Sequence, residues 1–93
     1  MDEARALLLV EELTELTEER VALLVSYGRV KAEAIVRYRD AILASEEPTI
    51  TGKQRYAETA TAALDAQAIV LDCELRANQA QLDRVTLTVQ ALA

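Results

Sequence analysis

The chain has 93 residues, a formal net charge of -6 and no histidine, and 52% of its residues are hydrophobic. The acidic balance argues against a general nucleic-acid binder, because phosphate contacts require a concentration of lysine and arginine. The lack of histidine removes the Ser-His and Cys-His pairs and the Glu-x-x-His metal motif, so we expect a non-enzymatic protein with no cofactor and no metal.

The first long helical pattern covers residues 3–45. Its apolar positions recur at steps of three or four, which places them on one face of an α-helix. Arg20 and Lys31 interrupt this stripe, and their long stems reach an edge of the face. The stripe consists of Leu9, Leu13, Leu16, Arg20, Leu24, Tyr27, Lys31, Ala34, Tyr38 and Ile42.

A break within this first helix is an open alternative. Thr14 and Thr17 are residue types that cap helix starts, and Gly28 lowers helix propensity by about 1 kcal/mol relative to alanine. The sequence does not decide between one helix and two at these positions.

The only proline, Pro48, marks a turn over residues 46–51. Proline lacks a backbone donor and biases Glu47 away from helical dihedral angles, so helix one is expected to end at Ser45. Thr51 and Gln54 have the spacing of a capping box, which predicts a second helix over residues 52–92.

Helix two has the cleaner stripe, with one polar interruption at Asn78. Its members are Ala57, Ala60, Leu64, Ala68, Leu71, Leu75, Asn78, Leu82, Val85, Val89 and Leu92. A buried asparagine in such a stripe typically fixes the register or the oligomeric state of a helical assembly. The alternative is a role of Asn78 in binding.

Together these patterns predict an all-α fold in which residues 1–93 form a single domain, an antiparallel two-helix hairpin. The runs Leu7-Leu8-Leu9-Val10 and Val21-Ala22-Leu23-Leu24-Val25 extend apolar surface well beyond one stripe. A helix with so wide an apolar surface must be covered on more than one side. We therefore expect a homodimer in which two hairpins form a four-helix bundle.

The charges of helix one are polarised, with seven acids between residues 2 and 19 and five bases between residues 20 and 39. This order complements the helix dipole. It also suits two antiparallel copies of helix one, since each acidic half would then face a basic half. Both explanations remain open, as does the choice between parallel and antiparallel protomers.

Ile69 and Val70 lie on either side of the helix-two stripe and extend its apolar surface. They either contact the second protomer or form a docking patch for another protein, and with Cys73 they are the candidate partner-binding residues. The basic residues are Arg29, Lys31, Arg37 and Arg39. Their spacing scatters them around the helix, which favours solvated side chains over a phosphate-binding track.

A lone cysteine, an acidic start at Asp2-Glu3 and the lack of a long apolar run predict a cytoplasmic protein without membrane insertion. Cys73 has no partner for an intramolecular disulfide. Its neighbours Asp72 and Glu74 disfavour a reactive thiolate, so a small packed side chain is the simplest expectation for it.

The chain resembles small, acidic, alanine-rich helical-hairpin proteins encoded by phages of actinobacteria. The resemblance rests on the Glu-rich leucine helix and a short threonine-containing turn, and it covers about two thirds of the chain. It depends on Tyr38, Ala41-Ile42-Leu43-Ala44, Thr51, Lys53, Arg55, Ala57-Glu58, Leu75-Arg76-Ala77 and Leu82. Members have a glycine or a basic residue where this chain has Glu47-Pro48, so the turn departs from the family pattern.

The resemblance implies a phage protein in the cytoplasm of a bacterial host that binds and inhibits a host protein through helix packing. One such target is a DivIVA-like polar-growth scaffold, itself a coiled coil, and the outcome would be growth inhibition or superinfection exclusion. The alternatives are an accessory role in phage DNA recombination or replication, using the four basic residues, and a structural assembly protein.

Overall fold

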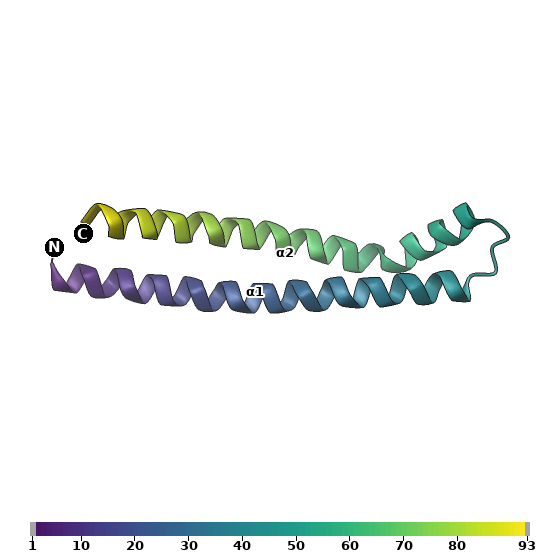
Figure 1. Cartoon of the computed structure of the whole chain (residues 1–93), viewed down its shortest axis with the longest axis horizontal. Coiled ribbons are helices and arrows are strands. Elements are labelled where there is room, and N and C mark those ends of the chain that lie inside the picture. The colour runs from purple at the N-terminus through teal and green to yellow at the C-terminus, as the bar shows by residue number, and fades with distance from the viewer. Residues whose placement is uncertain (1, 93) are drawn as a thin grey trace. The chain divides into compact units, whose positions relative to one another are not determined.

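A computed structural model of the chain describes residues 2–92, and within them it contains two α-helices and no strand. Helix α1 (Glu3–Ala44) has 42 residues and helix α2 (Ile50–Leu92) has 43, and both are drawn in Figure 1. The predicted all-α fold of two long helices is therefore confirmed.

The chain divides into two compact units. The central unit, Ser26–Leu71, is a helical hairpin that contains the end of α1, the connecting loop and the start of α2. The terminal unit combines residues 2–25, which include the first part of α1, with residues 72–92 of α2. Each unit has buried side chains from both helices.

The core of the central unit is small and apolar. Val30 and Ala34 of α1 pack with Leu64 and Ala68 of α2, and the partly buried Tyr27 and Leu71 extend this cluster. In the terminal unit the buried side chains are Leu16 of α1 and Asn78 and Val85 of α2. Both cores contain few buried side chains, as expected when two helices have no third layer to cover them.

The buried stripe of α1 differs from the predicted one at two positions. Leu24 and Lys31 are exposed, whereas Leu23 is half-buried and Val30 is 7% exposed. The buried and half-buried positions 9, 13, 16, 20, 23, 27, 30 and 34 alternate steps of four and three. This 3.5-residue period is that of helices packed along each other, whereas the predicted stripe followed the period of a single straight helix.

The buried stripe of α2 also differs from the predicted one at two positions, and at both of them a threonine takes the place of an apolar residue. Thr61 is 2% exposed and Ala60 is exposed, while Thr88 is half-buried and Val89 is 36% exposed. The Thr61 hydroxyl lies 3.1 Å from the carbonyl oxygen of Ala57, one turn earlier. A threonine whose hydroxyl bonds to its own helix in this way satisfies its polar group without a partner from the other helix.

The start of α2 corrects the predicted cap. Helix α2 begins at Ile50, two residues before the predicted start, and Thr49 rather than Thr51 caps it. The backbone N–H of Gly52 donates to Thr49 Oγ1 over 3.0 Å, which satisfies one of the donors that a helix start leaves free. Helix α1 ends at Ala44, one residue before the expected end.

Helix α1 is unbroken at the positions where an interruption was an alternative. The hydroxyl of Thr14 donates to the carbonyl of Val10 over 2.9 Å, and that of Thr17 to Leu13 over 2.7 Å. Both threonines therefore bond back into the helix instead of capping a new one.

Candidate functional site

The three predicted partner-binding residues are all exposed on the outer surface of α2. Ile69 is 66% and Val70 56% exposed, and Cys73 is also exposed. Cys73 follows Ile69 by four residues and Val70 by three, so Cys73 is a neighbour of each of them on the helix surface, whereas Ile69 and Val70 point in different directions. In this chain Cys73 is thus not the packed side chain that the sequence suggested.

Along this outer surface of α2 runs one line of small, uncharged residues. They follow the same alternating steps of four and three as the core, and they are Thr59, Ala63, Ala66, Val70, Cys73, Ala77 and Ala80, all exposed. Small side chains let another helix approach closely along the helix axis, because the distance between packed helices depends on the side chains at the contact.

Helix α1 has a second apolar series outside its core stripe. Leu7, Val21 and Ile35 repeat at multiples of seven residues, as do Val10 and Leu24, and their exposed fractions lie between 48% and 68%. Seven residues are two turns of a helix with a 3.5-residue period, so the members of each set share a register position. Repeated exposed apolar positions of this kind are typical of a helix that packs against a further helix.

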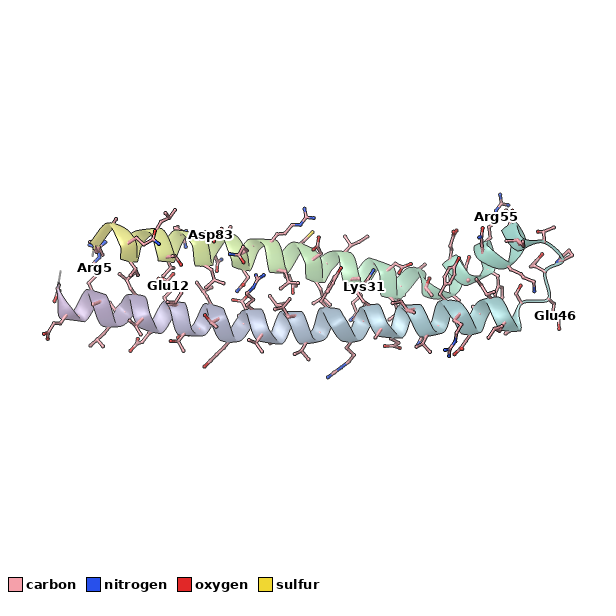
Figure 2. The ribbon with its side chains drawn as sticks, in the orientation of Figure 1. Arg5, Glu12, Lys31, Glu46, Arg55 and Asp83 are labelled. Atoms are coloured by element: carbon pink, nitrogen blue, oxygen red, sulfur yellow. The ribbon has the colours of Figure 1, made fainter. Side chains whose placement is uncertain are left out.

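A groove in the central unit lies between the two helices. Its volume is about 250 Å³, and it is lined by Lys31, Ala34, Ile35 and Tyr38 of α1 and by Glu58, Thr61 and Asp65 of α2. Figure 2 shows Lys31 extending from α1 toward α2. One wall of this groove therefore carries a base and the other carries two acids.

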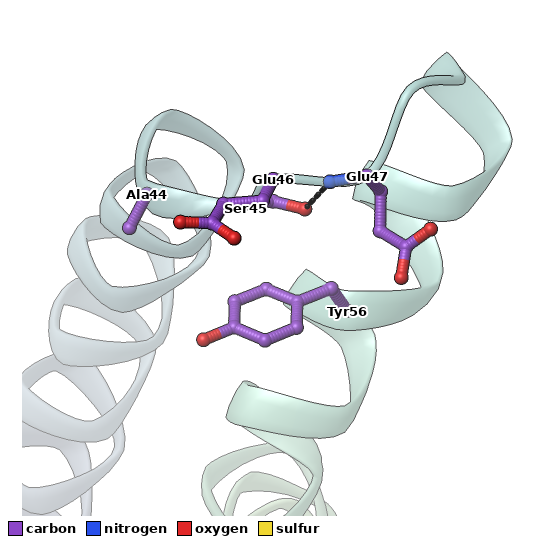
Figure 3. A pocket seen from close by; sticks show the side chains of 5 residues that line it. All are labelled: Ala44, Ser45, Glu46, Glu47 and Tyr56. Atoms are coloured by element: carbon purple, nitrogen blue, oxygen red, sulfur yellow. Dashed lines mark hydrogen bonds between the residues drawn. The ribbon is translucent and has the colours of Figure 1, made fainter.

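A second hollow lies at the loop and is drawn in Figure 3. Ala44, Ser45, Glu46, Glu47 and Tyr56 line it. The backbone N–H of Glu47 donates to Ser45 Oγ over 3.2 Å, and Lys53 Nζ donates to the carbonyl oxygen of Ser45 over 2.8 Å. These bonds tie the end of α1 to the first turn of α2 and explain why Ser45 is buried.

The four basic candidates do not gather into one surface. Arg37 pairs with Glu33 at 2.7 Å and Arg39 with Asp40 at 3.1 Å, so local acids neutralise two of the four charges. Lys31 lines the groove of the central unit, and Arg29 is exposed elsewhere on α1. The four residues therefore lack the shared, unpaired face that a phosphate backbone requires.

Asn78, the predicted register residue, is 2% exposed in the terminal unit. Its Nδ2 donates to the carbonyl oxygen of Leu16 over 2.9 Å, and Arg20 donates to its Oδ1 over 3.5 Å. These contacts are made within one chain, so the register that they set is that of α1 against α2 in the terminal unit. A role for Asn78 between protomers stays a prediction.

Residues 2–92 contain no group of three or more side chains able to hold a metal ion. Neither of the two helices described is apolar enough over a sufficient length to cross a membrane. Comparison with protein-family models, with curated proteins and with solved structures gives no match to this chain.

Sequence reasoning missed the groove of the central unit as a candidate site. Ile35, Glu58 and Asp65 were not proposed as site residues, because they lie outside the apolar stripes of both helices. The available signal was the fourteen-residue spacing of Leu7, Val21 and Ile35, which lies outside the core stripe of α1.

Proposed function

We propose that the chain is a non-enzymatic interaction protein. Two copies associate as a four-helix bundle, and the bundle binds a helical host protein through the outer surface of α2. This is the host-directed phage role that the sequence resemblance implies, with growth inhibition or superinfection exclusion as the result and a DivIVA-like coiled coil as the candidate target.

The observation that carries this proposal is the amount of surface left exposed. The accessible surface of the chain is 6821 Å², whereas size scaling gives about 5,300 Å² for a folded monomer of this mass. The excess of roughly 1,500 Å² is larger than the ~800 Å² that each partner contributes to a stable interface. The excess covers one such interface, which supports association with a second copy, and leaves most of the area that a further interface would need.

The surface proposed for the host protein centres on Val70 and Cys73. Its small side chains allow close helix approach, and an amphipathic helix that packs against a partner helix is a common recognition mode. A coiled-coil target consists of long helices, which offer a surface against which α2 can pack.

The test uses a purified DivIVA-like scaffold from an actinobacterial host and Val70→Asp, with calorimetry as the binding assay. Wild type is expected to bind, and Val70→Asp to lose at least about tenfold in affinity, because a carboxylate would be desolvated in an apolar contact. The matched control is Leu43→Asp, since Leu43 is 77% exposed and lies outside the proposed surface.

Circular dichroism and molar mass must show that both variants keep their helical content and their association state. Equal binding by wild type and both variants would remove the α2 surface from the proposal. Lack of binding by wild type would remove this target. If Val70→Asp unfolds the protein, Val70 belongs to the core of the assembly.

A further inference from the structure

The groove of the central unit has an apolar rim on each side. On α1, Ile35 lines the groove and is 68% exposed. On α2, Ile69 is 66% exposed and lies one helical turn beyond the groove residue Asp65. Ile35 therefore lines a hollow of about 250 Å³, which is large enough to take a side chain from another helix, and the spacing of Ile69 from Asp65 places Ile69 one turn beyond that hollow on α2.

We call this surface the groove face, and it consists of Lys31, Ile35, Glu58, Asp65 and Ile69. Its two walls carry opposite charges. Lys31 is the base of the α1 wall, and Glu58 and Asp65 are the acids of the α2 wall. The three ion pairs among residues 2–92 are Arg37–Glu33, Arg39–Asp40 and Arg76–Asp72. The three charged residues of the groove face therefore lie outside the ion pairs of the described chain.

We propose that the groove face binds the groove face of a second copy of the chain around a two-fold axis. The α1 wall of each copy then lies against the α2 wall of its partner. The dimer then contains two symmetry-related contacts, each between Lys31 of one copy and the acidic α2 wall of the other. Ile35 and Ile69 become covered in the dimer. This inference rests on the dimer of the proposed function and names the surface that forms it.

Self-complementarity is the reason for choosing a second copy as the occupant. A two-fold interface joins one patch to itself, so a patch with a base on one wall and acids on the other places unlike charges opposite each other when it meets its own copy. The assignment also divides the predicted partner residues. Ile69 is used for self-association, and Val70 and Cys73 remain for the host protein.

The decisive experiment mixes two charge-reversed chains, Lys31→Glu and Asp65→Lys. Each variant alone places like charges across the two-fold interface, so its dimer dissociation constant is expected to rise at least about tenfold. In an equimolar mixture the glutamate introduced at position 31 of one chain faces the lysine introduced at position 65 of the other, and native Lys31 faces native Asp65. The mixture is therefore expected to form a heterodimer, which native mass spectrometry resolves from both homodimers.

Lys31 and Asp65 also line the same groove within each copy. A change in charge contacts within one chain would not be reversed by adding the other variant, so recovery of the dimer on mixing reports contacts between chains. Both residues are exposed, so the variants should retain wild-type helical content by circular dichroism. The hydroxyl of Thr61 lies 3.2 Å from Asp65 Oδ2 and 3.1 Å from the carbonyl of Ala57. It therefore keeps a partner after the Asp65 substitution.

The control pair is Arg29→Glu and Glu74→Lys, which reverse charges at exposed positions outside the groove face. Both control variants are expected to dimerise as wild type does. If Lys31→Glu and Asp65→Lys alone also dimerise normally, the groove face is not the interface, although the dimer stands. If the wild-type protein is a monomer, both the proposed dimer and the proposed interface are wrong. Failure of the mixture to form a heterodimer would overturn the charge pairing.

Discussion

The side-chain amide of Asn78 donates a hydrogen bond to the main-chain carbonyl of Leu16 over 2.9 Å. This bond connects α2 to α1 at a core position of the terminal unit. A carbonyl oxygen has two lone pairs, so the oxygen of Leu16 accepts this bond in addition to the one that its own helix uses. A different alignment of the two helices would move Asn78 away from this oxygen, so the bond selects the helix register.

Replacing Asn78 with leucine is expected to raise stability and reduce register specificity. The carbonyl of Leu16 keeps its helical partner and the half-buried Arg20 reaches water, so no buried group is left without a partner. We expect the free energy of unfolding to rise by about 1 kcal/mol, because a polar residue at a core position specifies register at a cost in stability. Urea titration measures the stability, and extra amide peaks in an NMR spectrum would report the loss of a single register.

Asn78→Ala provides the comparison for that variant. It removes the same hydrogen bond but leaves a gap, so the free energy of unfolding should fall by about 1–2 kcal/mol. A fall of the same size for Asn78→Leu would show that the hydrogen bond itself, and not filled space, dominates at this position.

Replacement of the two glycines with alanine is expected to change the free energy of unfolding differently. A Cβ at Gly28 would meet nothing within 4 Å, whereas one at Gly52 would lie 3.1 Å from Glu47 Cβ and from Thr49 Oγ1. Gly28→Ala should stabilise the chain by about 0.5–1 kcal/mol through its higher helix propensity. Gly52→Ala should not stabilise the chain in this way, because its methyl group would push the capping hydroxyl of Thr49 out of position.

Thermal unfolding of both glycine variants, side by side, checks this difference. A destabilising Gly28→Ala would contradict the open space around Gly28 and would show that another copy of the chain contacts it.

Thr49 and Thr51 distinguish the observed helix cap from the one expected from the sequence. Thr49→Ala removes the oxygen that accepts the Gly52 N–H and should cost about 1 kcal/mol. Thr51→Ala should change stability by less than about 0.5 kcal/mol, because Thr51 is an exposed residue inside the first turn. Chemical denaturation of the two variants gives the answer, and a larger loss for Thr51→Ala would restore the predicted capping box.

Leu64 and Leu43 test whether the thin core of the central unit carries its stability. Leu64 is 8% exposed and packs with Val30 and Ala34, whereas Leu43 is 77% exposed. Leu64→Ala should lower the free energy of unfolding, measured by urea titration, by about 2–4 kcal/mol, and Leu43→Ala should leave it within about 0.5 kcal/mol. A comparable loss for Leu43→Ala would mean that Leu43 is covered in the assembled protein.

The sequence was sufficient to predict two helices, the turn between them and most of the α2 core. Those features follow from local periodicity and from Pro48, which act within a few residues. The exchange of Leu24 and Lys31 for Leu23 and Val30 was not predictable in the same way. It depends on how each helix twists to keep contact with the other, a property of the pair and not of either helix.

The candidate surfaces show a similar division. The periodicity of α2 was sufficient to place Ile69 and Val70 beside its core stripe, but not to decide whether a second protomer covers them. The groove face was not predictable, since it combines Lys31 and Ile35 with acids more than twenty residues away in sequence. Only the pairing of the two helices brings those residues together.

The proposed role of the exposed apolar surface of this chain is association with other helices, first with a second copy. Sedimentation equilibrium of the wild-type protein over a range of micromolar concentrations tests it most directly. A dimer would give a mass twice the 10.2 kDa of one chain. A mass of 10.2 kDa at every concentration, with full helical content, would contradict it.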